Sequence, residues 1–325
     1  MPNATPPRPI PPALAHNLRV PVIAAPMFLG SGPDLVVETC RAGVIGTFPA
    51  LNQRSSEWFR DWVQEIRGRL AAASAAAFGV NLIVHRSNPR LEADLEVCVA
   101  ERVPLIITSL GAVPDLVAQV HAYGGLVFHD VITARHAEKA AAAGVDGLVA
   151  VSAGAGGHAG TLNPFALLTE LRRRFAGPIA LAGAINTGAE VLAARAAGAD
   201  LAYMGTRFLA TREAMVAEGH KRMILEGQAG DIVYTDAVSG VRGNFLGPSL
   251  RTAGLGAAAG PGTLDVASEI KAWKEIWSAG QGVGGIEDIP AAGVLCGRLA
   301  REYAEACARL AADPFAASAS SGATL

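Results

Sequence analysis

One unit repeats along most of the chain: a short apolar run that ends in small or polar residues, followed by a helical stretch. The apolar runs lie at residues 20–25, 43–47, 78–84, 105–109, 126–129, 147–151, 178–182 and 201–204. They are apolar throughout rather than alternating, which is typical of strands covered on both faces. Alternating strands and helices require a parallel sheet. This α/β pattern favours a (β/α)8 TIM barrel over an open sheet.

The repeat breaks after Arg207. Residues 208–275 contain no apolar strand run, but they include a helical stretch at 211–228 and loops rich in Gly and Pro at 240–262. We therefore expect a small, mainly helical inserted domain at 208–275, placed to act as a lid. The barrel would then consist of residues 1–207 and 276–325, with its last helix at 286–310.

Composition narrows the classes of function. The 325 residues carry 27 basic and 29 acidic side chains, so there is no positive field to attract nucleic acid. No window holds the roughly 20 apolar residues that a membrane span needs, and the first twelve residues do not resemble a secretory signal. The four cysteines lie far apart in no metal-binding pattern. We expect a cytoplasmic enzyme that binds no metal, nucleic acid or membrane.

In such barrels the active site lies where the strands end. Two glycine-containing turns follow the last two strands, Gly183-Ala184 and Gly205-Thr206. Backbone N–H groups in turns of this kind can converge on an anion, and barrels often hold a phosphate there. The Thr206 hydroxyl can add a further hydrogen bond. These turns predict a phosphate site.

The loop at 154–160 formally matches a dinucleotide fingerprint, but two features argue against that interpretation. Asn163-Pro164 is the expected helix start, several residues too late, and the next strand ends without an acidic residue for ribose. His158 lies in this loop among small residues, where an imidazole is suited to act as a base. His129 is a weaker candidate, and the other five histidines are expected at helix, loop or surface positions.

The ends of the first and third strands suit a flat heterocycle. Met27 is polarizable and packs well against rings, and the amide of Asn81 offers both a donor and an acceptor. A ring at this place and a phosphate at the last two turns together predict a flavin mononucleotide, FMN.

The motifs as a set resemble one family over nearly the whole chain. Ala25-Pro26-Met27, Phe78-Gly79-Val80-Asn81, the segment 155–160, Ala182-Gly183-Ala184-Ile185 and the segment 204–208 are similar to those of the nitronate monooxygenases, and the late segment 277–281 looks like their final flavin loop.

The resemblance implies an FMN enzyme that oxidises propionate 3-nitronate or alkyl nitronates with O2 to carbonyl compounds and nitrite. His158 would abstract the α-proton of a neutral nitroalkane or position the nitronate. The residues expected to hold FMN are Ala25, Pro26, Met27, Asn81, Ser109, Asp130, Ser152, Gly157, Ala182, Gly183, Ala184, Met204, Gly205, Thr206, Gly280 and Gln281.

Two positions depart from the family pattern. Val151 and Gly154 stand where many members carry Gln and Glu, which leaves the substrate range open. The chain also resembles FMN-dependent NAD(P)H:quinone reductases, around Asp130 and Trp277, and FMN-type enoyl-ACP reductases, in the glycine–histidine motif. Those reactions stay open as alternatives, as does a flavin-binding protein without catalysis. The oligomeric state, with a homodimer among the options, stays open too.

Overall fold

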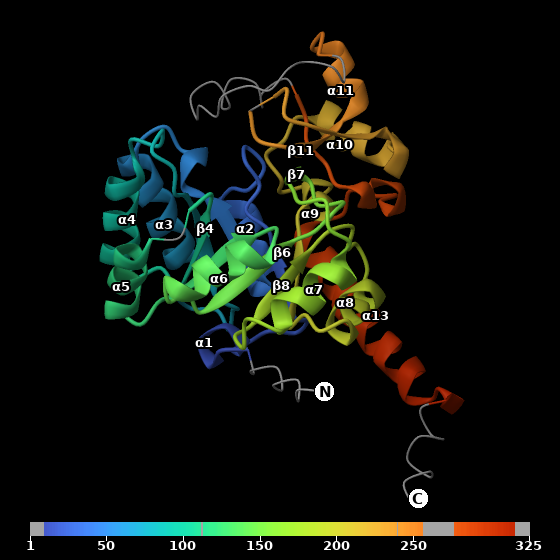
Figure 1. Ribbon diagram of the computed structural model, residues 1–325, viewed down its shortest axis with the longest axis horizontal. Coiled ribbons are helices and arrows are strands. Elements are labelled where there is room, and N and C mark those ends of the chain that lie inside the picture. The colour runs from blue at the N-terminus through green and yellow to red at the C-terminus, as the bar shows by residue number, and fades with distance from the viewer. Residues whose placement is uncertain (1–9, 112, 239, 256–275, 316–325) are drawn as a thin grey trace, which may run out of the picture.

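Eight parallel strands close into a barrel, which the helices surround (Figure 1). The computed structural model describes residues 10–111, 113–238, 240–255 and 276–315. The barrel strands are β1 (Val22–Ala24), β2 (Ile45–Pro49), β3 (Phe78–Ile83), β4 (Leu105–Ser109), β5 (Leu126–Val131), β6 (Gly147–Val151), β8 (Ile179–Ala182) and β9 (Leu201–Met204). Pairing of β9 with β1 closes the ring. The predicted TIM barrel is confirmed, with a strand at each of the eight apolar runs.

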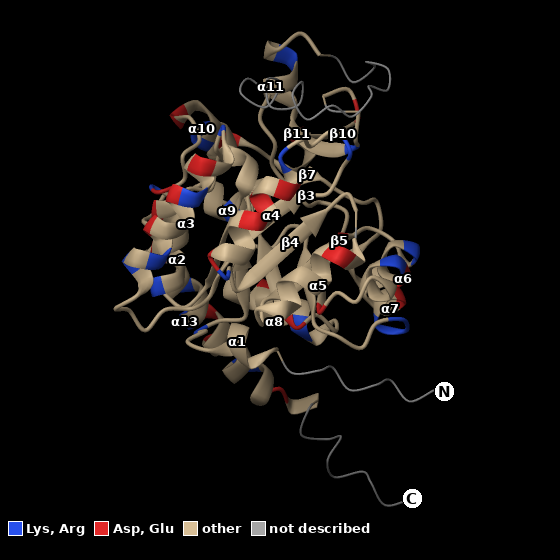
Figure 2. Cartoon of the chain, turned by 90° about the vertical axis from the view of Figure 1, so that its left-hand side faces the viewer, with Lys and Arg blue, Asp and Glu red and all other residues tan. Residues whose placement is uncertain are grey.

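Helices cover the outside of the barrel, and their charged residues face outward (Figure 2). Proline occupies the first helical position of α2, α5 and α7, where its missing N–H costs nothing. The Asn163 side chain accepts from the Phe165 N–H, so α7 begins where the sequence predicts. The helices are α2 (Pro33–Arg41), α3 (Ser56–Leu70), α4 (Leu91–Ala100), α5 (Pro114–Ala122), α6 (Ala134–Ala142), α7 (Pro164–Arg172), α8 (Gly188–Ala196) and α13 (Ala292–Ala311).

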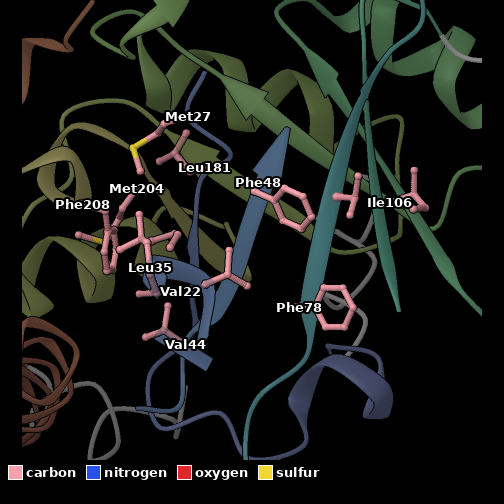
Figure 3. Packing of buried hydrophobic residues seen from close by; sticks show 14 of the residues in the cluster. Val22, Met27, Leu35, Val44, Phe48, Phe78, Ile106, Leu181, Met204 and Phe208 are labelled. Atoms are coloured by element: carbon pink, nitrogen blue, oxygen red, sulfur yellow. The ribbon is translucent and has the colours of Figure 1, made fainter. Parts of the chain in front are cut away.

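Each strand buries both of its faces. Ile23, Ile107 and Phe128 belong to the cluster inside the barrel, which also includes Leu14 of the short helix α1 (Pro12–Ala15). Their neighbours along the strands, such as Val22 and Ile106, belong to the cluster beneath the helices (Figure 3). Burial on both sides is the reason that the strand sequences do not alternate.

The junctions from helix to strand share one construction. Gly43, Gly144 and Gly198 have φ values of 83°, 84° and 108°, as a helix stop in the left-handed region requires. Two residues after Gly144 and Gly198 stand Asp146 and Asp200. Each carboxylate accepts from a backbone N–H of the preceding strand, Val127 or Ile179, at 2.8 Å. These bonds fix neighbouring strands at the N-terminal face of the barrel.

The expectation of a mainly helical insertion is wrong. After α9 (Thr206–Leu209), α10 (Glu218–Glu226) and η2 (Ala229–Asp231) come two antiparallel strands, β10 (Ile232–Thr235) and β11 (Gly243–Leu246), and then α11 (Gly247–Thr252). The third strand of this sheet is β7 (Gly157–His158), which belongs to the loop after β6. The strands of the insertion are only four residues long and carry polar side chains, so no apolar run marks them.

The predicted boundaries of the insertion and the barrel remain proposals. Residues 256–275 of the expected insertion, and residues 1–9 and 316–325 of the expected barrel, lie outside the described residues. The segment from 276 leads through η3 (Gln281–Gly285) into α13. Among the described helices, none is both long and apolar enough to cross a membrane.

Candidate active site

A cavity of about 1020 Å³ opens at the C-terminal end of the barrel, under the insertion. Its size is at the upper end of the range for small-molecule and cofactor sites. It is lined by most of the residues that the sequence singles out: Ala25, Pro26, Met27, Asn81, Ser109, Asp130, Gly157, His158, Ala182, Gly183, Ala184, Met204, Gly205, Thr206 and Gly280.

Two predicted residues lie outside the cavity lining. Ser152 is fully buried behind the turn after β8, where its hydroxyl donates to the Ala182 carbonyl at 2.7 Å. The Gln281 side chain is exposed, and its backbone N–H donates to the Gly154 carbonyl at 2.9 Å. Both residues therefore support the wall from behind.

The ends of β8 and β9 form a concave stretch of backbone. Gly183 has a φ of 141° and Ala184 a φ of 51°, so two successive residues depart from ordinary conformations. Backbone N–H groups in such turns can point together at an anion. Beside them, Thr206 Oγ1 accepts from the Gly280 N–H at 2.8 Å, which leaves the hydroxyl proton to donate elsewhere. The described residues that line the cavity include one carboxylate, Asp130, and it lies on β5.

The loop after β1 is fixed by Asn52, which sequence reasoning missed. The Asn52 side chain accepts from the Leu29 N–H at 2.8 Å and donates to the Met27 carbonyl at 3.1 Å. The Met27 N–H donates to Ser31 Oγ at 3.0 Å. These bonds hold the Met27 thioether against the cavity. Asn52 ends the short helix after β2, and no local pattern connects it to Met27.

A chain of polar side chains crosses three neighbouring strands. Asn81 Nδ2 donates to Ser109 Oγ at 2.8 Å, and Ser109 Oγ donates to Asp130 Oδ2 at 2.6 Å. Burial raises the pKa of Asp130 to about 6, although the Ser109 hydrogen bond and the charge of His158 act in the opposite direction. Tyr203 on β9 lines the same cavity, and burial together with the Asp130 charge raises its pKa.

The inserted sheet holds the strand that carries His158. In the β7–β11 pair, His158 lies opposite Gly243. The Ala159 N–H donates to the Arg242 carbonyl at 3.3 Å, and the Tyr234 hydroxyl donates to the Ala159 carbonyl at 3.0 Å. The imidazole is thus positioned by the insertion as well as by the barrel. Nothing in the loop sequence indicates this pairing.

Two more histidines in the lining are uncharged near neutral pH. Burial lowers the pKa of His129 to about 4, and Thr108 Oγ1 lies 2.8 Å from its Nδ1. Burial also lowers the pKa of His220 to about 4. His220 lies on α10, stacks on Trp277 with ring centroids 5.3 Å apart, and donates from Nε2 to the Ser278 carbonyl at 3.0 Å.

The cavity lining includes side chains that the strand-end rule does not reveal. His136 and Lys139 project from α6, and Arg242 projects from the segment before β11. A long side chain can reach the cavity from the second turn of a helix, where its position in the sequence gives no hint of it.

Comparison with known proteins shows the family and the fold of this chain. Residues 13–246 match the family model described as nitronate monooxygenase. The chain belongs to the nitronate monooxygenase family. It is therefore an oxidoreductase of that family.

Proteins similar to this chain are named for different activities. A nitronate monooxygenase of Paraburkholderia phytofirmans is 28% identical over 267 residues, which are 68% of this chain and 71% of the relative. A Rhodococcus jostii protein named (3aS,4S,5R,7aS)-5-hydroxy-7a-methyl-1-oxo-octahydro-1H-indene-4-carboxyl-CoA dehydrogenase is 28% identical over 230 residues, 71% of this chain and 63% of the relative.

The solved structures agree on the architecture. A nitroalkane oxidase from Streptomyces ansochromogenes superposes with a TM-score of 0.80 at 27% identity, and the match covers 92% of this chain and 99% of that one. FabK from Thermotoga maritima superposes with a TM-score of 0.77 at 24% identity, covering 92% and 97%, which shows a shared fold.

The two departures from the nitronate monooxygenase pattern lie at the cavity. Val151 and Gly154 both line it, so the cavity has an apolar side chain at one of these positions and no side chain at the other. Gly154 has a φ of 86°, and a Cβ added there would lie 3.0 Å from Gln281 Oε1. Gln281 therefore fills space into which a side chain at 154 would extend.

Proposed function

We propose that the chain binds FMN in this cavity and oxidises nitronates with O2 to a carbonyl compound and nitrite. Members of the family are flavin enzymes. The phosphate would lie at Gly183-Ala184 and Gly205-Thr206, and the one carboxylate among the described lining residues, Asp130, lies on β5. The ring would lie against Met27 and Asn81. The bound FMN would supply the redox chemistry between the substrate and O2.

His158 carries the proposal, because it lines the cavity from β7, which the inserted sheet holds in place. With a neutral nitroalkane, the imidazole would take the α-proton and leave a nitronate. A nitronate supplied directly has already lost that proton, so the imidazole would then donate a hydrogen bond to a nitro oxygen. The cavity combines apolar side chains with polar groups that could orient a substrate of either kind.

The substitution His158→Asn separates these roles. We expect the purified variant to keep its flavin and to release nitrite from a nitronate at a rate within several-fold of the wild type. Oxidation of the neutral nitroalkane should fall about 10²- to 10⁴-fold, since a general base typically contributes that much. Nitrite release under air measures both reactions. Equal losses on the two substrates would contradict the role of a base.

A second candidate is oxidation or reduction of an acyl thioester. The Rhodococcus jostii relative, named as a CoA dehydrogenase, is as similar to this chain as the nitronate monooxygenase, and Lys139 and Arg242 offer charge for an anionic carrier. Such chemistry also needs a base beside a flavin. NAD(P)H-driven reduction of a quinone or an enoyl thioester remains an alternative of the same class.

Anaerobic stopped-flow absorbance discriminates between these candidates. We expect a nitronate to bleach the flavin band rapidly, and NADH and acyl-CoA thioesters to leave it unchanged. With no response to a nitronate, rapid bleaching by NADH would instead support the NAD(P)H-dependent reductase. Rapid bleaching by a saturated acyl-CoA would instead support oxidation of an acyl thioester.

A further inference from the structure

The Asp130 carboxylate is held in the cavity wall with one oxygen bonded and one not. Oδ2 accepts from Ser109 Oγ at 2.6 Å, and Ser109 is itself fixed by Asn81. Oδ1 is shielded from solvent and has no hydrogen-bond partner in the structure. An unsatisfied buried carboxylate oxygen is costly, so its retention needs an explanation.

The loop that carries His158 folds back over the end of β5, where Asp130 lies. A Cβ added at Gly160 would lie 3.0 Å from Ile132 Cβ, two residues beyond Asp130. Ala155 and Ala159 belong to one apolar cluster, and Ile132 packs against it. Asp130 and His158 therefore face the same part of the cavity from adjoining segments.

Besides His129 and His220, other ionisable groups line the same cavity. They come from β9, from the inserted sheet and from α6, and they are Tyr203, Tyr234, Arg242, His136 and Lys139. Asp130 is the one carboxylate among the described lining residues. It is therefore the side chain of that set whose charge can stabilise an imidazolium.

We propose that Asp130 is a positioning residue for His158, and that its carboxylate, oriented by Ser109, stabilises the imidazolium formed when His158 takes a proton from a carbon acid. The proposal rests on the proposed role of His158 as a base. The proton moves from the α-carbon to an imidazole nitrogen, the electron pair stays on the substrate, and Asp130 remains ionised throughout. The attraction is mutual, in keeping with the downward contribution of His158 to the pKa of Asp130.

Titration of the His158 ring by NMR in the FMN-loaded protein tests this directly. The His158→Asn variant assigns the signal. In Asp130→Asn, which keeps the shape and removes the charge, we expect the titration midpoint of His158 to fall by about one pH unit. Asp130→Glu, which restores the charge, should bring the midpoint back toward the wild-type position. A matched control, Asp146→Asn at the other end of the barrel, should leave it in place.

Kinetics give a second readout. In Asp130→Asn the acid limb of the pH profile for neutral nitroalkane oxidation, where activity rises as the base loses its proton, should move with the NMR midpoint, with about a tenfold loss of kcat/KM. Nitronate oxidation should fall less than neutral nitroalkane oxidation, because a nitronate has already lost the proton that the base would take.

An unchanged His158 midpoint in Asp130→Asn would overturn the inference, whatever the activity. If the midpoint moves but His158→Asn retains full activity on neutral nitroalkanes, the coupling of Asp130 to His158 stands and the proposed function fails instead.

Discussion

At the scale of single residues, Gly183 shows how a buried neighbour shapes the proposed phosphate turn. A Cβ at this position would overlap Ser152 Oγ and lie 2.9 Å from the Ala153 carbonyl oxygen. Ser152 in turn is fixed by its bond to the Ala182 carbonyl. Ser152 thus acts on the turn from behind, without lining the cavity. The φ of 141° at Gly183 is a second reason for glycine at this position, since residues with a side chain are strained at that angle.

We therefore expect Gly183→Ala to lose most of its FMN. Absorbance near 450 nm per mole of purified protein measures the loss. The control is Gly124→Ala, which has a φ of 84° but no atom within 4 Å of the added Cβ, and which lies at the opposite end of the barrel. That variant should lose about 1 kcal/mol of stability and keep its flavin. Full flavin content in Gly183→Ala would contradict the proposal that the phosphate of FMN binds at this turn.

At the scale of elements, the decisive contact is the pairing of β7 with β11. It joins His158 to a sheet whose other strands come some 80 residues later in the chain. Gly243 lies so close to β7 that an added Cβ would be 2.8 Å from the Gly157 carbonyl oxygen. Any side chain at 243 must therefore push the two strands apart.

We expect Gly243→Ala to displace the imidazole and to lower neutral nitroalkane oxidation about 10- to 100-fold, since misplacement by about 1 Å can cost that much. Flavin content should be unchanged, because the proposed phosphate turns lie on β8 and β9. Gly230→Ala is the matched control, since it lies in the same insertion with nothing within 4 Å of the added Cβ. Steady-state nitrite release compares the two. Normal activity in Gly243→Ala would show that the pairing does not position His158.

The elements differ in how far their sequences reveal them. The eight barrel strands are readable because both faces are buried, and that burial makes the runs apolar. Strands β10 and β11 are not, since Tyr234, Thr235 and Asn244 interrupt them and their partner is a two-residue strand in a glycine-rich loop. The strand-end rule finds most of the cavity lining. It cannot find Lys139, whose side chain lines the cavity from α6, or Asn52, whose side chain fixes the loop that carries Met27.

At the scale of the whole molecule, the two ends of the barrel do different work. At the N-terminal face, the carboxylates of Asp146 and Asp200 accept hydrogen bonds from neighbouring strands, and Leu14 packs into the apolar interior of the barrel. These contacts stabilise the fold. The C-terminal face buries His129, His220 and Asp130 in or beside the cavity, where each is moved away from its ordinary pKa. Stability should therefore depend on pH mainly through the end that carries the site.

The sign of that dependence follows from proton counting. His129 and His220 have folded pKa values of about 4 against 6.5 when unfolded, so near pH 5 the unfolded chain holds about two more protons at these positions. Asp130, with a folded pKa of about 6 against 3.8, binds about one more proton in the folded state. In total, the unfolded state therefore binds about one more proton than the folded state near pH 5.

The free energy of unfolding should therefore rise between pH 4 and 6 by about 1.4 kcal/mol per pH unit. Urea unfolding followed by circular dichroism, at constant excess FMN, measures the slope. His220→Phe retains a ring to stack on Trp277 but removes one titrating group, so its slope over this window should be close to zero. Asp130→Asn removes the opposing group and should steepen the slope to about twice the wild-type value. If the free energy of unfolding changed with pH in the same way in all three proteins, these buried side chains would not be the cause of its pH dependence.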